Sequence, residues 1–234
     1  MSGARDDILG GIRRALRRGK LSEEAGAGLA ERVAAHRRNL IPARAVTLDP
    51  AARIDLFVAM AEEVQTTVAR VTAAGAVPVE VARYLASENL PAELVMAPDP
   101  WLDAIPWDAR PLLRIRRGRA EAGDAVSLTP CLAAIAETGT LMLVSGADTP
   151  TTLNFLPDTH IVVLRAGQVV ASYEDGFDLV RARSAWPRTI NLITGPSRTG
   201  DIEQRIQLGA HGPRRLHIVL IDEPETPGNA AHPG

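Results

Sequence analysis

The sequence predicts an α/β fold, in which a mainly parallel sheet is flanked by helices and an N-terminal helical appendage precedes the sheet domain. Helical patterns alternate with short apolar runs from residue 51 to residue 221. Such alternation is typical of parallel sheets covered by helices. Hydrophobic residues make up 46% of the 234 residues and aromatic residues only 3%, so the core is expected to be aliphatic and packed in layers.

The first forty residues have a pattern of their own. An apolar stripe at spacings of three and four, with arginines opposite, indicates an amphipathic helix: Ile8, Leu9, Ile12 and Leu16. A second helix is expected before Pro42. We predict a helical appendage over residues 1–40, which packs on its own domain or forms a homo-oligomer with a second copy of the chain rather than lying on a membrane.

Residues 41–223 are predicted to form the α/β domain. Residues 224–234, with three prolines and no apolar pattern, are predicted to be a disordered tail. The predicted helices cover residues 51–72, 78–88, 175–183 and 201–208. The predicted strands cover residues 94–97, 112–115, 125–128, 161–164, 169–171, 189–194 and 216–221, with 169–171 as a hairpin arm after 161–164 and 189–194 as the central strand.

The stretch from Gly195 to Glu203 has the pattern of a strand, a tight loop and a helix N-terminus. Two glycines allow a sharp turn, Ser197 and Thr199 are good helix caps, and Arg198 adds positive charge. Backbone N–H groups at a helix N-terminus suit a carboxylate or phosphate, because both charge and hydrogen bonds favour an anion there. The predicted anion-binding residues are Gly195, Ser197, Arg198, Thr199 and Asp201, with Glu203 also complementing the helix dipole; an ordinary capped turn has the same pattern.

A second polar group surrounds a glycine bend between two apolar runs. Glu137 precedes Gly139, and Thr138 and Thr140 bring hydroxyls to the same place. A carboxylate so placed could act as a base, a nucleophile or a hydrogen-bond acceptor. A glutamate that only ties down a hairpin remains the alternative.

Histidines and the cysteine limit the cofactors that the chain is expected to hold. No two histidines fall at His-x-His or i, i+4 spacing, so no metal site is predicted. His211, in a glycine-flanked turn with Gly212, is a candidate for proton transfer or for helix capping. His160 opens a predicted strand and is more typical of a structural residue.

Cys131 is the only cysteine, which excludes an internal disulfide and a cluster held by the chain's own thiolates, and we interpret it as a buried apolar residue.

Charge and hydropathy exclude two classes of partner. The net charge is −2 and basic residues are scattered, whereas nucleic-acid binding needs clustered positive charge, so no nucleic-acid partner is expected. No apolar run reaches the 18 or so residues of a spanning helix, and no targeting pattern is visible. We therefore expect a cytoplasmic protein without a membrane partner.

Four segments together resemble the LUD-domain family and, within it, the lactate utilization C group: residues 133–140, 156–160, 194–203 and 208–214. Their order and spacing match from about residue 41 to residue 222. The resemblance implies the fold of the glucosamine-phosphate isomerase, ribose-phosphate isomerase and CoA-transferase group. It also implies a bacterial role in oxidising L-lactate to pyruvate beside two iron–sulfur proteins. His160, Glu203 and Gly212 enter the candidate site as residues of these motifs.

Two hypotheses of function follow, with a weaker third. In the first, the chain is a component of a lactate-oxidising system that binds a small carboxylate or other anion at Arg198, with Glu137 facing the same pocket; iron–sulfur clusters are expected on its partners. Because the chain has no Gly-x-Gly-x-x-Gly fingerprint and no cluster ligands, it is not expected to catalyse the redox step alone. In the second, it is a self-sufficient CoA-transferase-like or sugar-phosphate isomerase-like enzyme that uses Glu137. The third is a structural subunit with a vestigial pocket.

Overall fold

The computed structural model describes residues 3–19, 21–38, 40–199 and 207–222, and the chain divides into two units, Met1–Leu40 and Ile41–Gly234. The first unit contains α1 (Gly3–Ala15) and α2 (Glu23–Ala35). The hydroxyl of Ser22 accepts a hydrogen bond from the N–H of Ala25, which caps the N-terminus of α2. The described residues contain no helix that is both long and apolar enough to cross a membrane.

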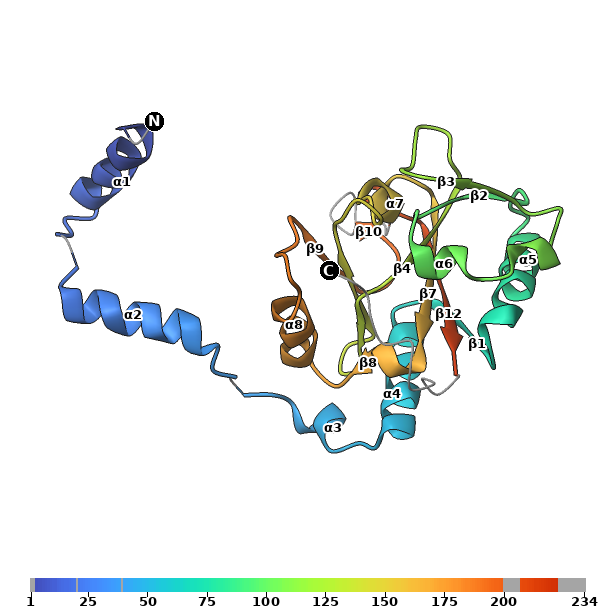
Figure 1. The fold of residues 1–234 in the computed structure, drawn as a ribbon, viewed down its shortest axis with the longest axis horizontal. Coiled ribbons are helices and arrows are strands. Elements are labelled where there is room, and N and C mark those ends of the chain that lie inside the picture. Colours follow the sequence, from blue (N-terminus) through green and yellow to red (C-terminus); the bar gives the residue numbers. More distant parts are fainter. Residues whose placement is uncertain (1–2, 20, 39, 200–206, 223–234) are drawn as a thin grey trace. The chain divides into compact units, whose positions relative to one another are not determined.

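The second unit is built on a six-stranded sheet in which every pairing is parallel (Figure 1). This confirms the predicted α/β class and the mainly parallel sheet. Because the middle strands have both faces covered, they read as mostly apolar runs in the sequence. In spatial order the strands are β1 (Thr67–Val71), β12 (Arg215–Ile221), β7 (Thr159–Arg165), β4 (Val126–Pro130), β2 (Glu93–Met96) and β3 (Arg114–Arg117).

A smaller sheet of four strands carries the Glu137 bend. Its β5 (Ala133–Ile135) and β6 (Thr140–Val144) form an antiparallel hairpin around that bend. On the outer sides, β8 (Val169–Val170) pairs with β5 in parallel and β9 (Ile190–Ile193) pairs with β6 antiparallel. A separate two-stranded ladder joins β10 (Arg198–Thr199) to β11 (Gln207–Leu208).

Helices complete the layers. The α-helices of this unit are α3 (Ala43–Val46), α4 (Pro50–Glu63), α5 (Val77–Ser87), α6 (Pro100–Asp103), α7 (Thr152–Phe155) and α8 (Tyr173–Arg181). In the described part of this unit there are also three 3₁₀ turns: η1 (Ala74–Ala76), η2 (Trp107–Ala109) and η3 (Ala166–Gln168).

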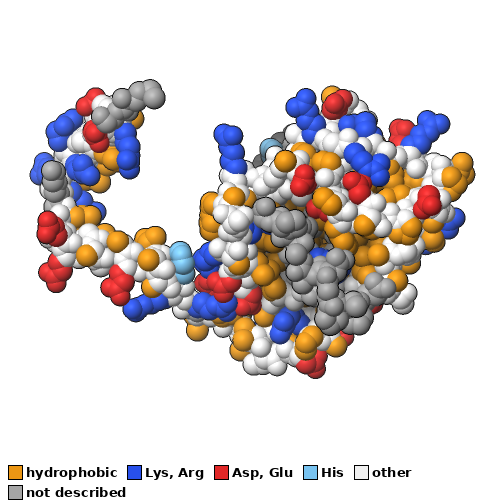
Figure 2. Space-filling view, in the orientation of Figure 1, with side chains coloured by type: hydrophobic (Ala, Val, Ile, Leu, Met, Phe, Trp, Pro, Cys, Tyr) orange, Lys and Arg blue, Asp and Glu red, His pale blue; other side chains and the backbone are white. Residues whose placement is uncertain are grey.

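Alternate residues of the central strands enter different core clusters. Val163 and Val219 pack in the cluster that includes α5, whereas Val162 and Ile218 pack with α4 and the small sheet. Successive side chains of a strand point to opposite faces, so α5 covers one face of the large sheet, and α4 and the small sheet cover the other. On the small sheet, Val180 of α8 packs in a third cluster with residues of β5 and β6. Figure 2 shows acidic and basic side chains interspersed on the face of the second unit that it presents.

Several predicted elements differ from the structure. The predicted helix 51–72 is too long: α4 ends at Glu63, Gln65 has a positive φ of 66°, and residues 67–71 form β1. The prediction of residues 169–171 as a hairpin arm after β7 is wrong, because β8 pairs with β5 instead. The expected central strand 189–194 is an outer strand of the small sheet, and the strand predicted at 112–115 lies at Arg114–Arg117.

The predicted helix at 201–208 is wrong for the residues that are described there. Gln207 and Leu208 form β11, which pairs antiparallel with β10. Asp201 and Glu203 lie outside the described residues, as does the predicted tail at 224–234.

Candidate functional site

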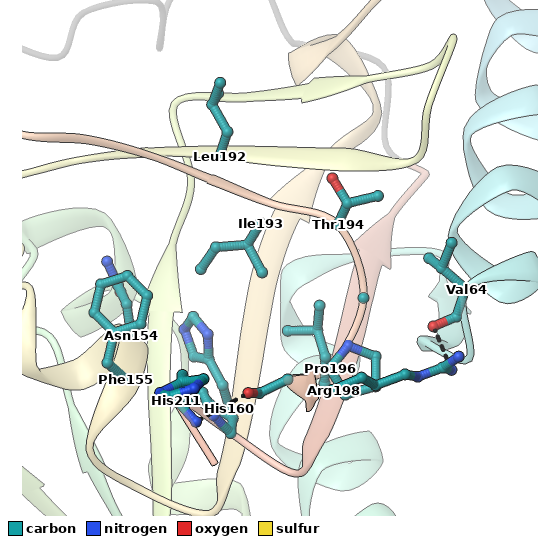
Figure 3. A pocket seen from close by; sticks show the side chains of 15 residues that line it. Val64, Asn154, Phe155, His160, Leu192, Ile193, Thr194, Pro196, Arg198 and His211 are labelled. Carbon is teal, nitrogen blue, oxygen red and sulfur yellow. Dashed lines mark hydrogen bonds between the residues drawn. The ribbon is translucent and has the colours of Figure 1, made fainter. Parts of the chain in front are cut away.

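A cavity of about 520 Å³ opens between β9 and the amino ends of β7 and β12 (Figure 3). The remaining walls come from α7, the end of α4 and the loop after β9. Ligands of open α/β sheets usually bind at the carboxyl ends of the strands, so this position departs from the common rule. Six of the residues that the sequence singled out line the cavity: His160, Gly195, Ser197, Arg198, His211 and Gly212.

The loop after β9 is held by contacts to remote parts of the chain. Gly195 has a φ of 79°, and a Cβ there would lie 2.7 Å from the carbonyl oxygen of Val64, so both the turn and the close approach require glycine. The Nη2 of Arg198 donates a hydrogen bond to the same carbonyl oxygen at 3.1 Å. Its other guanidinium donors have no hydrogen bond to the described residues.

Ser197 ties this loop to the turn that contains His211. Its N–H donates to the carbonyl of Pro213 at 2.8 Å, and its hydroxyl accepts from the N–H of His211 at 3.3 Å. The N–H of Ser197 is therefore already paired, contrary to the expectation of a free donor for an anion. Thr199 pairs with Gln207 in the β10–β11 ladder. Arg198 and the exposed His211 line the cavity with side chains that can donate hydrogen bonds to an anion.

His160 lies beneath the cavity as the second residue of β7 and is fully buried. Its Nε2 lies 2.8 Å from the Oγ1 of Thr129, whereas its Nδ1 has no hydrogen-bond partner among the described residues. Burial lowers the pKa of the imidazole to about 3, because the charged form loses its hydration. His160 is therefore neutral at physiological pH and offers either a donor or an acceptor at Nδ1, according to its tautomer.

Glu137 does not line this cavity. Its side chain is 5% exposed, and its Oε1 accepts a hydrogen bond from the N–H of Tyr173 at 3.2 Å, at the first residue of α8. A carboxylate at a helix N-terminus is favoured by the helix dipole. The backbone oxygen of Glu137 also accepts a hydrogen bond from Arg44. The expectation that Glu137 faces the Arg198 pocket is wrong, and its visible contacts are those of a residue that ties the hairpin to α8.

The two polar motifs nevertheless meet through hydroxyl groups. The Oγ1 of Thr140 lies 2.7 Å from that of Thr138 and 2.7 Å from that of Thr194, which lines the cavity. The phenolic oxygen of Tyr173 completes the group, 2.9 Å from the Thr140 hydroxyl. Gly139, with a φ of 65°, brings the bend against the backbone of α4. Thr138, Gly139 and Thr140 thus support the cavity from behind rather than line it.

The sequence reasoning did not single out six lining residues: Val64, Asn154, Phe155, Leu192, Ile193 and Leu216. Asn154 is a buried amide within the apolar run Leu153–Leu156, and that interruption is a signal for a polar site. Phe155 and Leu192 are each 45% exposed, which only the structure reveals. Nothing in the sequence points to Val64.

Asn154 also lines a second cavity, of about 230 Å³, beside Cys131. Burial raises the pKa of the Cys131 thiol to about 12, so it remains protonated. This confirms that Cys131 is a buried apolar residue. Within the described part of the chain, no three His, Cys, Asp or Glu side chains are grouped closely enough to hold a metal ion.

The fold and the cavity define an α/β protein whose candidate site lies between a parallel six-stranded sheet and a smaller sheet. The sequence profile of the LUD domain matches residues 54–221. The chain belongs to the LUD domain family.

Two curated relatives share part of this sequence. Lactate utilization protein C of Deinococcus radiodurans is 39% identical over 128 residues, which are 53% of this chain and 58% of that protein. A protein of the same name from Anoxybacillus flavithermus is 33% identical over 125 residues, which are 51% of this chain and 54% of that one. The chain thus spans somewhat more than half the length of these two curated relatives.

A solved structure has the same fold. A DUF162 family protein from Deinococcus radiodurans aligns with a TM-score of 0.59 at 28% identity, over 74% of this chain and 99% of that chain. The likeness agrees with the α/β architecture described above.

Proposed function

We propose that this protein is a component of an L-lactate utilization system that acts beside iron–sulfur partner proteins, and that its cavity binds a small carboxylate or another anion. The role in lactate utilization is supported by family membership and by the names of the relatives. The observation that carries the anion-binding part is that Arg198 and His211 both line a cavity of about 520 Å³.

The electrostatics of the cavity favour an anion. The described lining residues include Arg198 but no carboxylate. An arginine that meets a carboxylate forms charge-assisted hydrogen bonds, which are stronger than neutral ones. Because Nη2 is held by the carbonyl of Val64, the guanidinium is positioned before a ligand arrives and loses little rotamer freedom on binding.

Transfer of electrons from lactate is assigned to partners. Four cysteine thiolates usually hold an iron–sulfur cluster, whereas these 234 residues contain only Cys131. The self-sufficient enzyme that uses Glu137 has less support, because the carboxylate of Glu137 is buried against α8 and does not face the cavity. In the proposed system the chain binds the anion, and cluster-bearing proteins carry the electrons.

The test is L-lactate-dependent reduction of an artificial electron acceptor by the iron–sulfur partners, purified anaerobically, with and without this protein. Activity is expected to require the protein and to fall about tenfold or more in Arg198→Ala, since a charge-assisted hydrogen bond contributes roughly 1.5–3 kcal/mol. Arg119→Ala, at an exposed arginine that does not line the cavity, is the matched control and should retain activity. Equal lactate oxidation by the partners without the protein would refute the proposal.

A further inference from the structure

The cavity is much larger than a three-carbon acid requires. Its volume is about 520 Å³. A six-heavy-atom acid such as lactate takes at most about 180 Å³, at the roughly 30 Å³ per heavy atom of liquid water. A bare three-carbon acid would therefore leave about two-thirds of the space to water.

Large apolar side chains face this surplus space. Phe155 and Leu192 line the cavity and are each 45% exposed, and the half-buried Ile193 lies between them in Figure 3. Covering such surface in a concave site is favourable, because apolar area leaves water on both the protein and the ligand. A planar ring is the group best suited to the Phe155 side, since aromatic rings attract one another in offset or edge-to-face contacts.

Charge is confined to one side of the cavity. In Figure 3, Arg198 lies on the side of Val64, and Phe155 lies on the opposite side. The buried polar residues that border the space, His160 and Asn154, carry neutral groups, and no carboxylate is present among the described lining residues. This arrangement fits a ligand that has an anionic group at one end and an uncharged, largely apolar body at the other.

We infer that the cavity binds an aromatic carboxylate, with its carboxylate at Arg198 and its ring against Phe155, Leu192 and Ile193. This inference rests on the proposed function and narrows it, because it names the class of anion that the same cavity takes. A bare three-carbon acid occupies only the charged side and binds more weakly.

The test compares three probes by isothermal titration calorimetry on the purified full chain: L-lactate, L-3-phenyllactate and the neutral 3-phenyl-1,2-propanediol. Phenyllactate differs from lactate only by the added ring, and the diol lacks the carboxylate. Phenyllactate is expected to bind at least about tenfold more tightly than lactate, as the burial of one phenyl group implies. The diol is expected to bind more weakly than phenyllactate.

Variants test which residues contact the ring of the ligand and which contact its carboxylate. Phe155→Ala and Leu192→Ala are each expected to reduce the advantage of phenyllactate over lactate by about threefold or more, whereas Leu112→Ala, at an 86% exposed leucine outside this cavity, leaves it unchanged. Arg198→Ala is expected to weaken both acids by a similar factor and to leave the diol unaffected.

Equal affinities for lactate and phenyllactate would overturn the inference. It would also be overturned if phenyllactate still bound more tightly than lactate to both apolar variants by the same factor, or if neither acid bound at all. Failure here is separable from failure of the proposed function. If lactate-dependent reduction needs the protein and Arg198 while phenyllactate binds no better than lactate, the function stands and the ligand class is wrong. If phenyllactate binds tightly while the partners oxidise lactate without the protein, the ligand class stands and the function is wrong.

Discussion

The buried imidazole of His160 predicts a loss of stability in mild acid. Burial lowers its pKa from 6.5 to about 3 in the folded protein, so the unfolded chain binds a proton there at a higher pH than the folded chain does. The contribution of His160 to the free energy of unfolding is therefore fully present above about pH 6.5 and is lost progressively as the pH falls toward about 3.

The size of this loss follows from the shift. A pH of about 5 lies about 1.5 units below the ordinary pKa, and each unit is worth about 1.4 kcal/mol. Protonation of His160 in the unfolded chain therefore lowers the free energy of unfolding by about 2 kcal/mol at that pH. Below about pH 3 the complete pKa shift of about 3.5 units would lower the free energy of unfolding by roughly 5 kcal/mol.

The assay is urea unfolding followed by tryptophan fluorescence, at about pH 7.5 and about pH 5, on the unmodified protein and on His160→Gln. Glutamine keeps a hydrogen-bonding group for Thr129 but does not titrate in this range. We expect the loss of unfolding free energy between the two pH values to be about 2 kcal/mol smaller in the variant than in the unmodified protein. His211→Gln, at an exposed histidine, is the control for replacing an imidazole. An equal loss in His160→Gln and the unmodified protein would show that His160 does not titrate as a buried neutral group.

Three further predictions concern stability and reactivity. Gly139→Ala should destabilise the protein by about 2–5 kcal/mol in urea unfolding, because its Cβ would lie 2.4 Å from the backbone nitrogen of Ala61. Gly123→Ala is the control, since Gly123 also has a positive φ but a Cβ there would have nothing within 4 Å, and it should destabilise the protein less. An equal loss of stability in the two variants would argue against crowding at Gly139. Cys131 should react slowly with a thiol reagent at about pH 8 and rapidly in urea, since burial raises its pKa to about 12; rapid labelling of the folded protein would contradict this. Ser172→Ala should cost about 1 kcal/mol, because the hydroxyl of Ser172 caps α8, and an unchanged urea midpoint would rule out that contribution.

The strands with two buried faces could be predicted from the sequence, and the outer strand β1 could not. Residues 218–221 and 94–97 are continuous apolar runs, which is how a strand buried on both faces reads. In β1, Val68 and Val71 continue the helical spacing of α4, so local pattern favoured a longer helix. The change of direction is made at Gln65 in a left-handed conformation that glycine usually adopts, and pairing with β12 then fixes the strand.

The candidate site was predictable in its residues but not in its contacts. Gly195, Arg198 and His211 stand out because glycine-rich polar turns follow apolar runs. The partners that orient them are the carbonyl of Val64 and the backbone of residues 209–213, which sequence pattern does not connect to them. The same reason explains Glu137: the bend was recognisable, but the direction of its carboxylate depends on where α8 begins, and that is set by the return of the chain through β8.

The position of β12 between β1 and β7 has a consequence for the order of folding. Within the described sheet, β1 is bonded only to β12, which follows it by about 150 residues in the pairing of Thr67 with His217. During synthesis, β1 leaves the ribosome long before its partner exists, and an unpaired strand edge is a template for association with other chains. Pairings so distant in sequence also close slowly. We therefore expect β1 to be the last strand to join the sheet during refolding, and amide hydrogen exchange in pulse-labelled protein to show it protected together with β12 rather than before it.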